Sequence, residues 1–206
     1  MRIGIFGMPM AGKTFLLEVA KKQYGWNVFS RNEMLQEILL DISTHCNMDQ
    51  AYAEKIARKM LAMKLQKEDD FLIDGYYSSD SELVFLRDDI NVYDVFVYLY
   101  VDIDILRHRL GNSEKEKYQQ YAMWPSACLQ GWQDAEIDNL CYICNKYNKK
   151  FFILGDSAEG KETDINAYLD FLFALKNGNN VDDTATISNN NNRIENAKHV
   201  NVKSFG

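Results

Sequence analysis

The sequence predicts an α/β protein of three layers, with a five-stranded parallel sheet between two layers of helices. Short, continuously apolar segments alternate along the chain with longer segments of helical periodicity. Strands that are apolar throughout are typical of a parallel sheet with helices on both faces. A glycine-containing loop, residues 7–14, joins the first such segment directly to a helical one. Because ligands of these sheets bind at the carboxyl ends of the strands, we expect a site at that edge.

The first half of the chain contains three expected strands, at residues 3–6, 27–29 and 71–75. A helix is expected at 13–24, where Gly25 can close it. Polar residues at 30–32 can cap a helix that runs to about residue 41. Asn47 followed by Gln50 resembles a capping arrangement for a long helix to about residue 66. The strand at 71–75 carries a carboxylate, Asp74, where it ends.

The second half contains two further expected strands, at 94–101 and 151–154, and helices at 79–86, 102–110, 127–148 and 163–175. Residues 111–125 break this pattern and contain Gly, Pro and alternating Glu and Lys, so we predict a mobile, lid-like insertion. Asparagine-rich sequence of balanced charge begins at residue 177 and has too few apolar residues to fold. We therefore expect one domain, residues 1–176, and a disordered tail, residues 177–206.

Composition limits the function. The formal net charge of −7 argues against a protein whose main affinity is for nucleic-acid phosphates, although a local basic groove remains open. With no apolar run long enough for a membrane span and no signal peptide, we expect a cytoplasmic protein without a membrane partner. Its cysteines are then expected to be reduced. Cys141 and Cys144 fit the apolar stripe of a helix, so we interpret them as buried thiols rather than zinc ligands.

The loop at residues 7–14 has the pattern G-x-x-x-x-G-K-T, which binds phosphate when it joins a strand to a helix. Its backbone N–H groups and the helix N-terminus would converge on phosphate oxygens. Glycine allows the tight curve and the close approach of the backbone. Lys13 would reach the β- and γ-phosphates, and the Thr14 hydroxyl would bind Mg²⁺. The predicted nucleotide-binding residues are Gly7, Met8, Pro9, Met10, Ala11, Gly12, Lys13 and Thr14.

A series of segments resembles the nucleoside-monophosphate kinases, adenylate kinase most of all and thymidylate kinase next. Residues 7–13 are similar to that family's G-x-P-G-x-G-K, and residues 29–35 to its I-S-T-G-D-M-L. Residues 72–76 resemble its L-D-G-F, residues 100–110 the segment that carries a catalytic arginine, and residues 152–156 the loop beside the ATP base. The resemblance extends from residue 1 to about 175. It implies a P-loop kinase fold and an enzyme that uses ATP and Mg²⁺.

The resemblance also implies roles for individual residues. Lys13, Asp74 and Arg109 would be catalytic: Asp74 would hold the Mg²⁺ shell, and Arg109 would neutralise charge on the γ-phosphoryl group. Arg107 competes with Arg109 for that role. The implied acceptor-binding residues are Ser30, Arg31, Glu33 and Glu82.

Departures from the family pattern leave the acceptor open. Gln36 and Ser78 stand where acceptor-side arginines are expected, so Arg31 alone would remain to bind an acceptor phosphate. The first hypothesis is transfer of the γ-phosphoryl group of ATP to a nucleoside monophosphate. The second is transfer to a hydroxyl of a nucleoside, a small metabolite, or a hydroxymethylated base or end of DNA, with Glu33 or Asp74 as general base. The third is a non-catalytic ATP-binding protein. The oligomeric state stays open.

Overall fold

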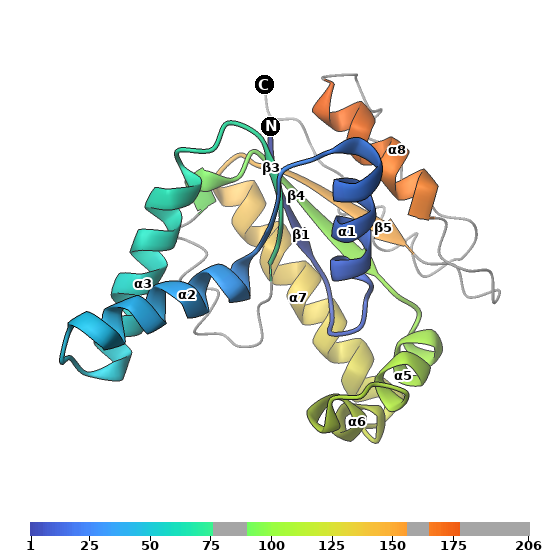
Figure 1. The fold of residues 1–206 in the computed structure, drawn as a ribbon. Coiled ribbons are helices and arrows are strands. Elements are labelled where there is room, and N and C mark those ends of the chain that lie inside the picture. Colours follow the sequence, from blue (N-terminus) through green and yellow to red (C-terminus); the bar gives the residue numbers. More distant parts are fainter. Residues whose placement is uncertain (76–89, 156–164, 178–206) are drawn as a thin grey trace.

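The computed structural model describes residues 1–75, 90–155 and 165–177. At its centre lies a five-stranded sheet of order β2-β3-β1-β4-β5 (Figure 1). All neighbouring strands pair in parallel, which confirms the predicted fold class. The strands are β1 (Arg2–Phe6), β2 (Val28–Ser30), β3 (Phe71–Asp74), β4 (Val95–Tyr100) and β5 (Lys150–Gly155).

The helices of the described part of the chain follow the predicted alternation. They are α1 (Lys13–Tyr24), α2 (Arg31–His45), α3 (Gln50–Leu65), α5 (Ile103–Gly111), α6 (Glu116–Ala122), α7 (Ser126–Lys146) and α8 (Ile165–Lys176), with a short 3₁₀ helix at Ile90–Val92. The expected helix at 79–86 and the expected tail lie outside the described residues.

Three boundaries or elements differ from the prediction. Helix α2 continues four residues beyond the expected end, because Ile42 packs against Ala53 and Ala57 of α3. The side chain that caps α3 belongs to Asp49, which accepts a hydrogen bond from the Ala51 N–H at 3.1 Å, and not to Asn47. The segment 111–125, expected to break the pattern, contains helix α6.

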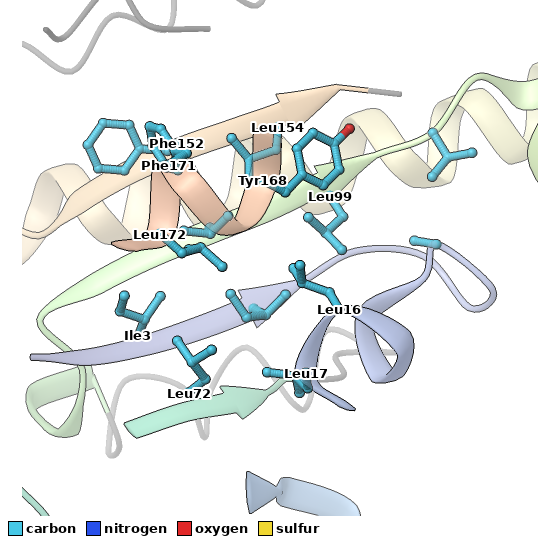
Figure 2. Close-up of a cluster of buried hydrophobic side chains, with 14 of the residues drawn as sticks. Ile3, Leu16, Leu17, Leu72, Leu99, Phe152, Leu154, Tyr168, Phe171 and Leu172 are labelled. Atoms are coloured by element: carbon cyan, nitrogen blue, oxygen red, sulfur yellow. The ribbon is translucent and has the colours of Figure 1, made fainter. Parts of the chain in front are cut away.

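The sheet buries different side chains on its two faces. On the face toward α1 and α8, aliphatic residues such as Val97, Leu99 and Leu154 form most of the strand contribution (Figure 2). On the face toward α3 and α7, aromatic residues such as Phe96 and Tyr98 dominate. The two clusters confirm the three-layer arrangement. Tyr98 belongs to the second cluster, so its side chain lies on the α7 side of the sheet.

Arg2 and Asp94 join the start of β1 to the start of β4. Asp94 accepts hydrogen bonds from the Arg2 backbone N–H at 2.8 Å and from the Arg2 guanidinium at 3.0 Å. Burial alone would raise the pKa of Asp94, but these hydrogen bonds and the guanidinium charge hold it below its usual value. The lowered pKa means that Asp94 stabilises the fold above the pKa of the unfolded chain, and that this contribution is lost as pH falls through the folded pKa.

We therefore expect Asp94→Ala to lower the free energy of unfolding by about 1 kcal/mol at pH 7, and by less at pH 3. Urea unfolding at the two pH values measures this difference. The exposed residue Asp138 provides a control, since Asp138→Asn should leave the pH dependence as in the wild type. An equal loss at both pH values would contradict the prediction.

Gly75 follows Asp74 and lies against the ring of Phe6. A Cβ atom at Gly75 would overlap this ring. The ring is buried and stacks on Phe96 with centroids 5.3 Å apart, while Tyr93 meets it edge-on at 6.3 Å. Because the ring is buried and packs against Phe96 and Tyr93, moving it away from Gly75 would disturb these contacts. The glycine of the Asp-Gly pair is therefore required for space.

Gly75→Ala is expected to destabilise the protein by about 1–3 kcal/mol, the usual cost of overpacking a well-filled core. Thermal or urea unfolding measures this loss. Gly131 of α7 has no atom within 4 Å of the corresponding Cβ position, so Gly131→Ala should instead stabilise the helix by roughly 0.5–1 kcal/mol. Equal effects of the two substitutions would show that contact with Phe6 is unimportant.

Candidate active site

The carboxyl ends of three neighbouring strands bring the predicted site residues together. Asp74 of β3 pairs with Ile5 of β1 on one side and with Ser30 of β2 on the other. On the other side of β1, Tyr98 of β4 pairs with Phe6, the residue that precedes the loop at 7–14. The loop therefore leaves the sheet between Asp74 and Tyr98.

Backbone geometry explains the two glycines of the loop in different ways. Gly7 has φ 145°, and a Cβ there would lie 2.7 Å from the carbonyl oxygen of Leu99. Gly12 has φ 95° at the N-cap of α1, where a Cβ would meet open space. Gly7 is thus required for both space and conformation, and Gly12 for conformation alone. Met10 occupies the left-handed region at φ 65°, which costs a non-glycine residue about 1–2 kcal/mol.

Lys13 begins α1 and lies over the loop. Its ammonium donates hydrogen bonds to the carbonyl oxygens of Gly7 at 2.6 Å and Met8 at 2.9 Å, and the residue is only 9% exposed. Burial lowers the pKa of Lys13 to about 8, although the carboxylates of Glu136 and Asp74 oppose this shift. Lys13 therefore lies where a lysine would meet phosphates held by the loop, in surroundings that disfavour its charge.

Asp74 ends β3, between the strand that leads into the loop and the residue that precedes α2. One of its oxygens accepts a hydrogen bond from the backbone N–H of Arg31 at 3.3 Å. Burial raises the pKa of Asp74, and the charge of Glu33 raises it further, whereas Lys13 and the Arg31 N–H act in the opposite direction. A half-buried carboxyl group with a raised pKa is a stronger proton acceptor than an ordinary aspartate.

The acceptor-side predictions have different outcomes. The Ser30 hydroxyl accepts a hydrogen bond from the Glu33 N–H at 3.4 Å and so caps α2. Arg31 follows it and is 4% exposed, while the Glu33 side chain is exposed. Glu82 lies outside the described residues. The structure thus brings Arg31, Glu33 and Asp74 to one edge of the sheet.

Helix α5 carries both candidate arginines. A guanidinium nitrogen of Arg107 donates to the carbonyl oxygen of Trp124 at 2.8 Å and so joins α5 to the segment before α7. Arg109 lies half-buried on the same helix. Both arginines therefore lie on one helix, and the role of Arg109 toward the phosphoryl group stays a prediction.

Sequence reasoning missed the contribution of α7. The hydroxyl of Tyr98 donates to a carboxylate oxygen of Glu136 at 2.8 Å, and Gln133 is completely buried one helical turn earlier. The two polar residues fall on the stripe of α7 that also carries Leu129, Ile137 and Leu140. The sequence signal for a polar contribution from α7 was the presence of a glutamine and a glutamate within an otherwise apolar stripe.

The expected Mg²⁺ fits the donors that are present. The Thr14 hydroxyl lies exposed in the first turn of α1, and Asp74 lies half-buried at the end of β3. Mg²⁺ prefers oxygen ligands and commonly combines one or two protein ligands with phosphate and water. Thr14 and Asp74 are therefore the residues that would hold it.

Comparison with models of known protein families shows the family to which the chain belongs. Residues 6–122 match the family model described as AAA domain, which is more than half of the chain. The chain belongs to the AAA domain family. The part that matches the AAA domain model begins at the end of β1 and extends through α6, so it includes the phosphate-binding loop, Asp74 and Arg109.

Solved structures extend the AAA domain assignment to the fold of the chain. Shikimate kinase from Bacteroides thetaiotaomicron is 17% identical, with 86% of this chain and 98% of that chain covered and a TM-score of 0.51. Shikimate kinase from Acinetobacter baumannii in complex with shikimate is 13% identical, with coverages of 87% and 94% and a TM-score of 0.52. No curated protein matches the chain. The predicted P-loop kinase fold is confirmed, and the prediction of an ATP-dependent kinase agrees with it.

The described helices were also compared with the requirements of a membrane span. None of them is both long enough and apolar enough to cross a bilayer.

Proposed function

We propose that this protein is an ATP-dependent phosphotransferase of the P-loop kinase type, which transfers the γ-phosphoryl group to a hydroxyl of a small-molecule acceptor. The observation that carries this proposal is the carboxyl group of Asp74, which has a raised pKa and lies within the electrostatic influence of Lys13. A hydroxyl acceptor requires a general base near the phosphoryl group, and Asp74 is the group that we propose for this role.

In this reaction the acceptor oxygen forms a bond to the γ-phosphorus, and the bond from that phosphorus to the bridging oxygen of ADP breaks. The N–H groups of the loop and the N-terminus of α1 hold the phosphates. Lys13 and Arg109 neutralise charge on the transferred group. Asp74 accepts the proton of the hydroxyl, directly or through a water molecule. Thr14, with Asp74 acting through a bound water, would hold Mg²⁺, which would supply positive charge near the transferred phosphates.

The electrostatics favour a hydroxyl over a phosphate acceptor. The charge of Glu33 raises the pKa of Asp74, and the charges of Glu136 and Asp74 raise the pKa of Lys13. Three carboxylates therefore contribute negative charge at this edge of the sheet. A phosphate dianion would be repelled by these groups. Among the described residues of α2 and the strand before it, Arg31, which is 4% exposed, can oppose them with positive charge.

A nucleoside monophosphate is the second candidate, and the position of Arg31 favours it. Arg31 is the first residue of α2 and lies beside Asp74. A helix N-terminus attracts anions, and an arginine there can bind phosphate with two parallel hydrogen bonds. If the acceptor carries a phosphate, Arg31 would bind it.

The test is a γ-phosphate transfer assay with radiolabelled ATP and a panel of nucleosides, hydroxy acids, nucleoside monophosphates and hydroxymethylated DNA. We expect turnover with a hydroxyl acceptor, and we expect Arg31→Ala to change kcat/KM by less than about threefold. Turnover confined to nucleoside monophosphates would favour the second candidate instead. In that case Arg31→Ala should lower kcat/KM by roughly 10- to 150-fold, with Arg31→Lys intermediate. Nucleotide binding without transfer to any acceptor would favour the non-catalytic hypothesis.

A further inference from the structure

A single buried side chain of α7 holds the backbone at the point where β4 ends. The amide oxygen of Gln133 accepts a hydrogen bond from the Val101 N–H at 3.3 Å, and its amide nitrogen donates to the Val101 carbonyl oxygen at 3.0 Å. Gln133 is completely buried, and Val101 is 1% exposed. Because buried backbone groups need hydrogen-bond partners, a side chain without polar atoms could not replace this glutamine.

The paired hydrogen bonds take the place of a neighbouring strand. The pairing of β4 with β5 ends at Tyr100 and Gly155, and its pairing with β1 ends at Tyr98 and Phe6. Val101 therefore lies beyond the last pairs on both sides of β4. A glutamine amide presents both a donor and an acceptor, so it can bond to the N–H and the C=O of one residue as a strand would. Helix α7 thus supplies the support that the sheet does not.

The supported segment lies between the phosphate-binding loop and α5. Two residues before Val101, the carbonyl oxygen of Leu99 lies so close to Gly7 that a Cβ atom there would be 2.7 Å away. One residue after Val101, Asp102 is the N-cap of α5. Helix α5 follows directly and carries Arg109. The position of Val101 therefore determines where α5 begins relative to the loop.

Helix α5 is also attached toward its other end. The Arg107 guanidinium donates to the carbonyl oxygen of Trp124 at 2.8 Å, and the ring of Trp124 packs against that of Trp132 with centroids 5.9 Å apart. Trp132 directly precedes Gln133 in α7. Figure 1 shows α5 and α6 beside the same end of α7. One turn of α7 therefore contacts the segments on both sides of α5.

We propose that Gln133 is a positioning residue, which fixes the start of α5 on the sheet and thereby places Arg109 for the transferred phosphoryl group. This proposal rests on the proposed function, in which Arg109 neutralises charge on that group. Catalytic groups must be held precisely, since a displacement of about 1 Å caused by a distant substitution can lower turnover by about 100-fold. Gln133 needs no contact with a reacting atom in this role, because it acts through the backbone of Val101.

The first measurement is kcat and KM of Gln133→Met, which keeps a similar volume and removes both hydrogen bonds. We expect kcat to fall by about 10- to 100-fold and the KM for ATP to change by less than about threefold, because the phosphate-binding loop itself is unaltered. Gln130→Met is the matched control and should retain the wild-type kcat, since the Gln130 amide donates within α7, to Asp134 at 2.7 Å. An unchanged kcat in Gln133→Met would overturn the proposal.

Gln133→Glu is the conservative variant and also serves if Gln133→Met does not fold. Glutamate keeps the shape of the side chain and an acceptor for the Val101 N–H, but it loses the donor for the Val101 carbonyl when it is ionised. Its kcat should therefore lie between those of the wild type and Gln133→Met. A kcat equal to that of the wild type would contradict a role for the paired hydrogen bonds.

A double-mutant cycle with Arg109→Ala separates positioning from general support of the fold. If Gln133 acts through Arg109, its substitution should lower kcat by less than about twofold in the Arg109→Ala background, because the group that it places is already gone. An equal loss of kcat with and without Arg109 would show that the two residues act independently. That result would overturn the proposal and leave the proposed function intact.

Hydrogen exchange supplies a measurement that needs no acceptor. Amides of residues 101–111 should exchange faster in Gln133→Met than in the wild type, whereas those of β1 and α3 should exchange at the wild-type rate. Faster exchange throughout the chain would show a loss of global stability and would count against positioning. If the wild type phosphorylates no acceptor, the proposed function and the role of Arg109 both fail. Faster exchange confined to residues 101–111 would then still show that Gln133 fixes the start of α5.

Discussion

Lys13→Met is expected to lower phosphoryl transfer by about 1000-fold or more, because it removes the positive charge from the β- and γ-phosphates. The loop binds Lys13 through the carbonyl oxygens of Gly7 and Met8, so the ammonium starts next to the phosphate position. The measurement is kcat/KM for ATP with whichever acceptor the panel identifies. Lys22→Met, at an exposed position of α1, is the matched control and should retain wild-type activity.

The same substitution should not destabilise the protein. In the fold the pKa of Lys13 is lowered from 10.5 to about 8. A lowered lysine pKa means that folding disfavours the charged form, with the full cost present below pH 8 and absent above the pKa of the unfolded chain. The shift corresponds to about 3 kcal/mol at most, offset in part by two lost hydrogen bonds. Lys13→Met should therefore unfold at or above the wild-type temperature at pH 7, and this difference should fall as pH rises from 8 to 10. Near-normal turnover of a folded variant would contradict the assignment of the loop.

Asp74→Asn is expected to lower kcat by about 100- to 10,000-fold, the usual contribution of a general base. Asparagine keeps an oxygen that can accept the Arg31 N–H, so the hydrogen bond at the end of β3 can persist. Glu33→Gln is the informative comparison, since Glu33 is the alternative base and is exposed. If Glu33→Gln reduces turnover as severely and Asp74→Asn does not, the base is Glu33.

Asp74→Asn should increase the stability of the protein although it lowers its activity. The pKa of Asp74 is raised in the fold, chiefly by burial. For an acid with a raised pKa, stability is greatest below the unfolded pKa and is lost as pH rises through the folded pKa. Asp74→Asn should therefore be more stable than the wild type at pH 7, and equally stable near pH 3. Thermal unfolding at both pH values tests this. A lower melting temperature at pH 7 would show that the Asp74 charge stabilises the fold.

Local sequence signals predicted most of the fold. The bounds of α1 follow from Gly12 and Gly25, and both glycines have the left-handed backbone that ends a helix or opens one. Continuous apolar runs located the strands because both faces of this sheet are covered. The extension of α2 to His45 was missed because it depends on contact with α3, which is distant in sequence from the expected helix end.

The candidate site was predictable where one short motif determines it. The residues of the phosphate-binding loop and Asp74 were predicted because each is a local pattern at the end of an apolar strand, and their roles stay predictions. The sequence did not show that the Ser30 hydroxyl caps α2, and its acceptor contact stays a prediction. Glu136 was missed because its meaning depends on Tyr98, a residue 38 positions away on another element. The polar residues within the apolar stripe of α7 were a signal, but no local pattern in a single sequence identifies Tyr98 as the partner of Glu136.

The ring of Phe6 has a consequence for how this family can vary. It lies directly before Gly7 and fills the space over Gly75, the residue that follows Asp74. One aromatic side chain therefore acts as a spacer between the phosphate-binding loop and the carboxylate beside it. Positions 6 and 75 should then covary among relatives, with glycine at 75 wherever an aromatic residue occupies 6. A larger residue at 75 should be tolerated only together with a smaller one at 6, and the two substitutions should be strongly epistatic.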